Sequence, residues 1–381
     1  MLLNILAVIE QNSWVEFHII DSLKTMGHQV QCFYIGDYVG EFYGRSRKDE
    51  QLKKNIDLLS QAKQLRDLQS LDLIFCYVYD DFLLEEYAKK LAQLGVPMVN
   101  YNVDMPTKWY RAIKTSRYFD CMLCAQPQHM KSLSKYSRKV HYFPMAAPVI
   151  TSEENHSNII SIADLTFLGT SLPFRQRLLN ALAQEEWTLE VYGKYWNEIE
   201  PDTIIRSKEK ALSDMISYAW PRLKYERSNF VRKIFSERIF PKNHATQSHL
   251  PSNVLKGPIK NEEITSLLRC SKINLGITRY EGDSLLKKGS CKMKLRDFEV
   301  PMAGGFYLVE QSPGYENAFI DGKEVVTWET LPDLKEKISY FLQHDKEREE
   351  IARAGQVRAE REHSWQSRFV ELFNELDLNG P

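Results

Sequence analysis

The chain has 381 residues, which is about two and a half domains at roughly 150 residues per domain. It carries 50 Lys and Arg against 51 Asp and Glu, so the formal net charge of −1 argues against a general nucleic-acid binder. No apolar run approaches the roughly 18–20 residues of a membrane helix, and the N-terminus has no signal-peptide pattern. We therefore expect a cytoplasmic protein.

The first part of the chain alternates short apolar runs with longer amphipathic stretches, the pattern of a parallel sheet wrapped by helices. It predicts strands at 5–9, 30–35, 73–78, 98–102, 118–123 and 140–143 and helices at 15–23 and 82–94. These elements make one Rossmann-like domain over residues 1–150. Cys121 and Cys124 form the only C-x-x-C, and we expect them to pack in the core rather than to bind a metal or act in redox chemistry.

After a polar linker at 152–161 the same alternation starts again, which predicts a second Rossmann-like domain over residues 151–364. Its expected strands are 165–169, 189–193, 273–277, 305–309 and 324–326, and a helix is expected at 173–184. The fold class is therefore α/β, with two doubly wound domains. No G-x-G-x-x-G follows the first strand, which argues against an NAD-dependent dehydrogenase. The nine histidines show no metal-ligand spacing, so no metal site is expected.

Residues 206–250 interrupt the second domain with ten Lys and Arg against four Asp and Glu, interleaved with six aromatic residues. One interpretation is docking to a membrane surface, an anionic glycan or a partner protein. The other is a helical excursion with aromatics packed inward and charges in solvent.

Two strand-to-helix junctions in the second domain have features of phosphate sites. The first runs from Gly169 through a Thr170–Ser171 cap into a helix with an early proline, and Arg175 stands near its start. A guanidinium there is able to fork onto phosphate oxygens.

The second junction is a Gly- and Lys-rich loop at 281–290 that leads into a helix expected from about Lys292. Helix N-termini favour anions, and a carboxylate at Glu299 is able to accept both hydroxyl protons of a ribose. The alternative is a surface ion pair between Arg296 and Glu299, three residues apart. Gly304 is expected to end the helix in a left-handed conformation.

Several motifs in the order found here resemble the CgeB-like (spore maturation protein B) glycosyltransferases. They are ADLTFLGTSLPFRQRLL, LEVYGKYW, LRDFEVPMAGGFYLVE, DGKEVVTW and EREEIARAGQVRAEREHSWQSRF, with weaker likeness at VNYNVDMP and YFPMAAP. The resemblance implies a GT-B fold and metal-independent transfer of a sugar from a nucleotide-sugar, with retention of configuration. It also implies that domain 1–150 lies on the acceptor side, completed by a helix at about 365–381, and that domain 151–364 binds the donor.

The resemblance assigns donor-binding residues by position. Glu299 matches the residue that holds the ribose, and Gly169, Arg175, Lys288 and Lys294 match positions that face the phosphates. The remaining donor-side positions are Thr170, Tyr192, Gly193, Lys256, Gly257 and Arg296. One departure stands out: related retaining enzymes carry a second glutamate eight positions before the ribose-binding one, and here that position is Cys291.

The expected reaction requires stabilisation of the leaving diphosphate and a proton acceptor near the acceptor hydroxyl. Asp104, after strand 98–102, is the candidate for that second role, and Gln11, Asn12 and Ser13 are candidates on the acceptor side. The expected partners are a nucleotide-sugar and a glycan, lipid-linked glycan or protein acceptor, with no cofactor and with docking at the inner membrane face through 206–250 as an option. The alternatives are a nucleotide-sugar epimerase and a non-catalytic binding subunit on the same fold.

Overall fold

The computed structural model describes residues 2–11, 13–36, 45–103, 109–150, 163–196, 250–281 and 290–378. The contacts divide the chain into two compact units. The first unit comprises Met1–Val149, Met293–Glu299 and Arg358–Pro381, and the second comprises Ile150–Lys292 and Val300–Val357. Asn12, Asp104, Lys288 and residues 206–249 lie outside the described residues.

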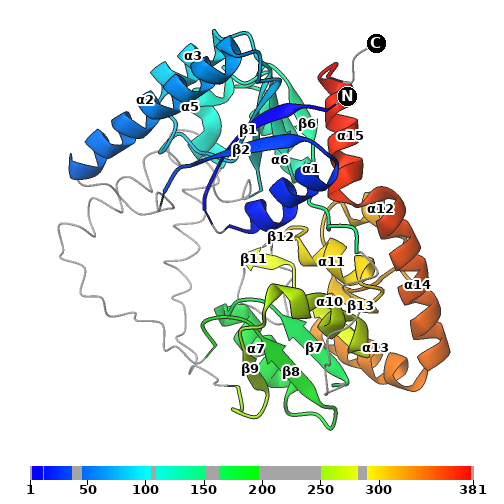
Figure 1. Cartoon of the computed structure of the whole chain (residues 1–381). Coiled ribbons are helices and arrows are strands. Elements are labelled where there is room, and N and C mark those ends of the chain that lie inside the picture. The colour runs from blue at the N-terminus through cyan, green and yellow to red at the C-terminus, as the bar shows by residue number, and fades with distance from the viewer. Residues whose placement is uncertain are drawn as a thin grey trace. The chain divides into compact units, whose positions relative to one another are not determined.

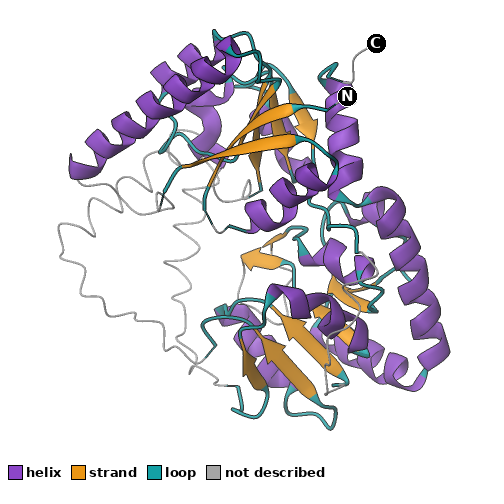
Figure 2. Ribbon diagram, in the orientation of Figure 1, coloured by secondary structure: helices purple, strands orange, loops and turns teal. Residues whose placement is uncertain are grey.

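The first unit contains a six-stranded parallel sheet in the order β2-β1-β3-β4-β5-β6 (Figures 1 and 2). Its strands are β1 (Asn4–Ile9), β2 (Gln29–Tyr34), β3 (Leu73–Cys76), β4 (Met98–Asn102), β5 (Cys121–Cys124) and β6 (Val140–Tyr142). Its helices are η1 (Glu16–Ile20), α1 (Asp21–Thr25), α2 (Arg45–Asp67), α3 (Glu85–Ala92), η2 (Trp109–Ala112), α5 (Ile113–Ser116), α6 (Pro127–Leu133) and α15 (Trp365–Glu375). All six expected strands are therefore confirmed.

The core of the first unit explains why the C-terminal helix belongs to it. Alternate residues of β1, such as Ile5 and Ala7, pack with Trp365 and Phe369 of α15 and with the apolar residues of η1 and α1. Trp365 and Phe369 are fully buried. The helix α15 thus supplies a face of this core from the far end of the chain.

The second unit contains a parallel sheet in the order β14-β13-β10-β7-β8-β9 and a two-stranded antiparallel hairpin, β11-β12. Its strands are β7 (Leu165–Leu168), β8 (Leu189–Tyr192), β9 (Leu255–Gly257), β10 (Ile273–Gly276), β11 (Arg279–Glu281), β12 (Ser290–Cys291), β13 (Tyr307–Glu310) and β14 (Val326–Trp328). Its helices are α7 (Pro173–Leu182), α10 (Asn261–Cys270), α12 (Tyr315–Ala318) and α13 (Leu331–Gln343). The helices α11 (Arg296–Met302) and α14 (Asp345–Glu362) each contain residues of both units.

Helices α7 and α13 cover the apolar face of this second sheet, with Leu178 and Ile338 among the buried contacts. The chain turns from α11 into β13 at Gly304, whose φ of +75° confirms the expected left-handed end of that helix. A Cβ there would lie 2.8 Å from the side chain of Gln356. The turn thus requires glycine for both its conformation and its space.

Two element predictions are wrong. The 23-residue helix α2 between β2 and β3 has no counterpart in the prediction, because its sequence is strongly polar overall and its buried stripe, Leu58, Ala62 and Leu65, occupies only the C-terminal half. The helix expected from Lys292 begins instead at Arg296, since the Asp297 carboxylate accepts the backbone N–H of Lys294 at 2.6 Å and fixes the start of the helix there.

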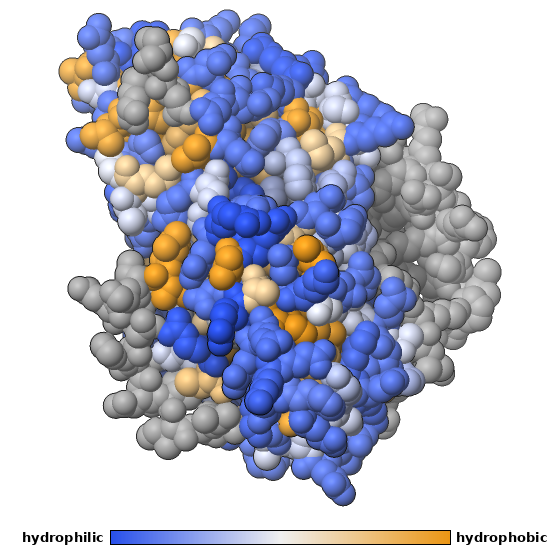
Figure 3. All heavy atoms as spheres, turned by 90° about the vertical axis from the view of Figure 1, so that its right-hand side faces the viewer, coloured by the Kyte–Doolittle hydropathy of each residue, from blue (hydrophilic) through white to orange (hydrophobic). Residues whose placement is uncertain are grey.

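No helix in the described ranges is long and apolar enough to cross a bilayer. The face drawn in Figure 3 is mostly hydrophilic, with hydrophobic residues in small separate groups. Exposed apolar side chains scattered in this way are normal for a folded protein and do not by themselves mark an interface.

Candidate functional site

Three glycines lie side by side at the carboxyl edge of the second sheet. Gly169 and Gly193 directly follow β7 and β8, and Gly257 ends β9. The N–H of Gly169 donates to Tyr192 and the N–H of Gly193 donates to Gly257, each at 2.9 Å. The backbone is therefore locked across all three strand ends.

Gly193 has no room for a side chain. Its φ is +138°, and a Cβ would lie 2.1 Å from the carbonyl oxygen of Gly169. Glycine at this position therefore lets the loops after β7 and β8 pack directly against each other through their backbones.

Helix α7 begins beside these glycines, and its start differs from the prediction. The expected Thr170–Ser171 cap is wrong, because the residue at the N-cap is Leu172, which offers no capping side chain. Ser171 is held elsewhere: its N–H donates to the carbonyl of Lys194 at 3.1 Å, and its hydroxyl accepts from Gln176 at 2.8 Å. The N-terminus of α7 therefore keeps backbone N–H groups that no capping side chain occupies, as at an anion-binding helix end.

Arg175 lies in the first turn of α7 and is 8% exposed. Its Nη1 donates to the carbonyl oxygen of Thr170 at 2.8 Å, and its guanidinium carbon lies 5.4 Å from the ring centre of Phe167. These contacts fix a positive charge against the Gly169 loop. Arg175, Gly169 and Thr170 are thus brought together, as the sequence predicts for the phosphate end of a donor site.

Tyr192 and Lys256 meet through an acid that sequence reasoning missed, Glu190. The Tyr192 hydroxyl donates to Glu190 Oε2 at 2.9 Å, and Lys256 Nζ lies 3.3 Å from Glu190 Oε1. Burial raises the pKa of the Tyr192 hydroxyl, and its hydrogen bond to Glu190 raises that pKa further. These two residues, expected on the donor side, are both engaged with Glu190, on the adjacent strands β8 and β9.

The loop after β10 is held by a buried ion pair that the sequence did not reveal. Arg279 Nε donates to Glu310 Oε1 at 2.8 Å, and the two side chains are 3% and 2% exposed. The Arg279 guanidinium also lies 4.0 Å from the ring centre of Phe174 on α7. One arginine therefore links the ends of β10 and β13 to the start of α7.

The expected continuous loop from 281 into a helix is wrong, because β12 intervenes. Cys291 is buried on β12 and is paired in register with Arg279 of β11. The position where related retaining enzymes carry a glutamate thus holds a buried thiol in a hairpin. The preceding residues 282–289, with Lys288, lie outside the described residues.

Glu299 on α11 is paired within the first unit. Arg296 Nη1 lies 2.6 Å from Glu299 Oε2, and His18 Nε2 lies 3.5 Å from Glu299 Oε1. The Arg296–Glu299 pair named above as the alternative therefore exists, although the carboxylate is only 10% exposed. Burial lowers the pKa of His18 despite the opposing attraction of Glu299.

The carboxyl edge of the first sheet is lined by amides and aromatic rings. Asn100 donates to the carbonyl of Val78 at 3.0 Å and accepts from its N–H at 3.1 Å, and Asn102 also donates to that carbonyl at 3.2 Å. Trp14 packs edge-on against Tyr77, with ring centres 5.8 Å apart.

The predicted acceptor-side residues lie after β1, at the same edge. Gln11 is exposed, and the Ser13 hydroxyl donates to the carbonyl of Glu10 at 2.8 Å. The structure therefore assigns Ser13 a turn contact and places Gln11 at the surface.

The described residues contain no group of three or more His, Cys, Asp or Glu side chains placed to hold a metal ion. Cys121 and Cys124 are fully buried free thiols, as expected for core residues. Burial raises the pKa of each thiol to about 11. Both are therefore protonated near neutral pH and unsuited to redox chemistry.

The model of a family described as glycosyl transferase-like matches residues 175–374. Among solved structures, the chain is similar to Anabaena HepE in complex with UDP and glucose, at 12% identity and a TM-score of 0.61, over 98% of this chain and 99% of that one. It is similar to sucrose-phosphate synthase from Thermosynechococcus elongatus, at 10% identity and a TM-score of 0.57, over 99% and 100%. It also matches a glycosyltransferase from Rickettsia africae at 12% identity and a TM-score of 0.57, over the whole of both chains. The fold is GT-B, while a comparison with curated protein sequences gave no match.

Proposed function

The chain belongs to the glycosyl transferase-like family and is a glycosyltransferase, and on that premise we propose that its donor is a uridine diphosphate-sugar. Its acceptor is a hydroxyl of a glycan, a lipid-linked glycan or a protein. The motifs of the sequence favour the CgeB-like branch of the family. The observation that carries the donor proposal is the N-terminus of α7, which no side chain caps, beside the fixed charge of Arg175.

This edge offers what a diphosphate requires. A helix N-terminus and an arginine both attract anionic oxygens. HepE was solved with UDP, which supports a uridine nucleotide for a chain of the same fold. In this proposal, Arg175 and the α7 terminus bind the diphosphate, and Glu299 accepts the ribose hydroxyls.

In the transfer step the bond between the anomeric carbon and the diphosphate oxygen breaks, and a bond to the acceptor oxygen forms. The diphosphate leaves with the electron pair and gains negative charge, which Arg175 and the α7 N–H groups stabilise. The acceptor hydroxyl loses a proton, and Asp104 is the proposed group that receives it. The proposal also includes retention of configuration and no requirement for a metal ion.

A thermal-shift panel without metal tests the donor site. UDP at about 100 times its Kd should add roughly 2.7 kcal/mol to the wild type, whereas GDP, ADP, dTDP and CMP should add less. Arg175→Ala and Glu299→Gln should each reduce the UDP shift. Glu336→Gln changes an exposed carboxylate on α13 and is the matched control.

Product analysis separates the alternatives. Transfer that persists in EDTA, with the donor's anomeric configuration kept in the NMR spectrum of the product, supports the proposal. Turnover of the donor without any acceptor would indicate an epimerase. Absence of a shift with every nucleotide would contradict the donor site and favour a binding subunit.

Membrane docking is the part of the proposal that concerns residues 206–250. Their basic and aromatic composition suits the anionic inner face of a membrane, where a lipid-linked acceptor would be found. Flotation with vesicles containing anionic lipid, compared with neutral vesicles, tests this location. Equal recovery from both would contradict it.

A further inference from the structure

Tyr195, in the loop after β8, has two features that do not contribute to the stability of the fold. Its side chain is 57% exposed, so most of its large apolar ring is not used in packing. Its φ is +67°, in the left-handed region that bulky residues avoid. A glycine or asparagine would hold this conformation with less strain.

The residues on both sides of Tyr195 are fixed to the loop after β7. Trp196 is buried, and its Nε1–H donates to the carbonyl oxygen of Gly169 at 2.9 Å. Its ring packs edge-on against Phe167 with centres 5.9 Å apart. On the other side, the carbonyl of Lys194 accepts the N–H of Ser171 at 3.1 Å. The backbone is therefore held in the strained conformation, and the tyrosine ring is presented to solvent from a rigid base.

Strained residues that a structure holds in place in this way cluster at ligand-binding sites. We propose that the Tyr195 ring is the platform on which the nucleobase of the donor stacks. The proposal rests on the donor site proposed above and adds a residue to it. The phosphates of a nucleotide need donors and positive charge, which α7 and Arg175 offer, whereas the base is flat and uncharged and is suited to an aromatic face.

The neighbouring Tyr192 is less suited to this role. The Tyr192 hydroxyl donates a hydrogen bond to Glu190, and the side chain is partly buried at the end of β8. Less of its ring is therefore available to a ligand. Tyr195 lies three residues further along the same loop, and its ring is open.

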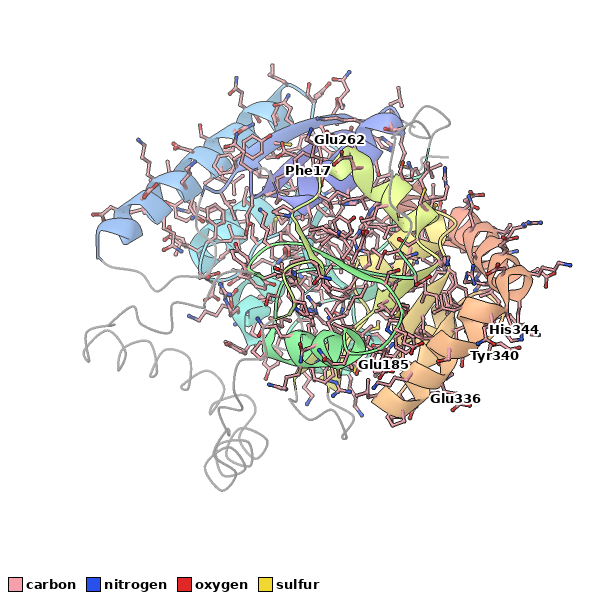
Figure 4. The ribbon with its side chains drawn as sticks, turned by 90° about the horizontal axis from the view of Figure 1, so that it is seen from below. Phe17, Glu185, Glu262, Glu336, Tyr340 and His344 are labelled. Atoms are coloured by element: carbon pink, nitrogen blue, oxygen red, sulfur yellow. The ribbon has the colours of Figure 1, made fainter. Side chains whose placement is uncertain are left out.

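Calorimetric titration with UDP on the full-length protein tests the platform. Tyr195→Asn and Tyr195→Gly should each raise the Kd about 5- to 150-fold, the range expected for loss of one base–aromatic stack. Tyr195→Phe keeps the ring and should bind within about twofold of the wild type. Tyr340→Leu is the matched control, because Tyr340 is an exposed tyrosine on α13 that stacks on His344 (Figure 4).

Two further measurements separate stacking from a structural role. Pyrophosphate, which has no base, should bind the wild type and Tyr195→Asn equally. The unliganded Tyr195→Asn protein should have a Tm no lower than that of the wild type, because asparagine adopts the left-handed conformation with less strain. Weaker UDP binding combined with a lower Tm would mean that the ring supports the loop, and this would overturn the proposal.

The result with UDP also distinguishes the two proposals. UDP binding that is the same in the wild type and in Tyr195→Asn overturns the platform and leaves the donor site intact. A wild type that binds no nucleotide overturns both.

Discussion

The two parallel sheets have related topologies, but their carboxyl edges are built from different chemistry. In the second unit the edge consists of the glycines after β7, β8 and β9, a buried Arg279–Glu310 pair and the outward ring of Tyr195. In the first unit, side-chain amides bind the backbone around Val78, and aromatic rings fill the space beside them. The first edge thus presents side-chain amides and aromatic rings, and the second presents the start of α7 with the buried Arg175.

The topology of a parallel sheet therefore places a binding site at the carboxyl ends of its strands, whereas the side chains there determine which ligand binds. A helix N-terminus and a fixed charge suit an anion, whereas amides and aromatic rings suit a neutral, hydroxyl-rich molecule. Three substitutions test how the two edges are held, and a fourth tests the pH dependence of the first unit.

Arg279→Met should have the largest effect. It leaves the Glu310 carboxylate buried without its partner, and breaking a buried pair in this way costs about 3–5 kcal/mol. Urea unfolding measures the loss. The exposed Lys335–Glu185 pair is the control, and Lys335→Met should cost less than about 1 kcal/mol. Equal losses would mean that the buried pair does not hold the edge.

Gly193→Ala should cost about 2–4 kcal/mol, because the new methyl group would collide with the Gly169 carbonyl at a left-handed φ. Gly257→Ala isolates the backbone contribution, since Gly257 has a φ of +79° and no atom within 4 Å of a built Cβ. It should cost about 1 kcal/mol. Thermal unfolding of the two variants gives the contribution of the collision as the difference, and no difference would contradict the close approach.

Asn100→Leu tests the first edge. It removes the acceptor for the buried Val78 N–H, which should cost about 1–3 kcal/mol. Asn102→Leu removes only one of the two donors to the Val78 carbonyl and should cost less. If Asn102→Leu lost more unfolding free energy than Asn100→Leu in urea, Asn100 would not be the residue that mainly holds the Val78 backbone.

The pH dependence of stability should show the smallest effect. Burial lowers the pKa of His18 below its usual 6.5, so the unfolded chain binds the proton more readily than the folded one. The contribution of neutral His18 to the free energy of unfolding is therefore fully present above pH 6.5, and it decreases as the pH falls below that value. The groups that face His18 are Glu299, Arg296 and Asp21. Denaturant unfolding at pH 7.5 and 5.5 should show a smaller acid loss in His18→Gln than in the wild type. If the variant lost more unfolding free energy than the wild type between pH 7.5 and 5.5, the pKa of His18 would be raised in the folded protein and the prediction would be wrong.

Much of the fold could be predicted from the sequence, because parallel strands buried on both faces are short apolar runs. All strands of the first sheet and five of the six in the second were predicted in this way, and Gly304 marked the end of α11. Strand β9 was not predicted, and helix α2 was missed because its buried apolar residues are confined to its C-terminal half within a strongly polar sequence. The β11–β12 hairpin was missed because its pairing joins residues across a polar loop.

The site was predicted less completely, for physical reasons. Gly169 and Arg175 followed from a strand-to-helix junction, which is a local pattern, and Gly193 followed from the family resemblance. Glu190 and the Arg279–Glu310 pair depend on which strands become neighbours, and no local pattern carries that information. The left-handed backbone of Tyr195 is set by tertiary contacts of Trp196, and tyrosine itself gives no signal for it.

The return of the C-terminal helix α15 to the first unit affects how the protein folds during synthesis. The core around β1 requires Trp365, Phe369 and Leu372, which the ribosome adds more than two hundred residues after Val149. A nascent chain that ends at Val149 exposes the apolar faces of β1 and α1 until α15 emerges. The first unit to be synthesised is therefore the last to close its core, and a chaperone that shields apolar strands would act on it for most of translation.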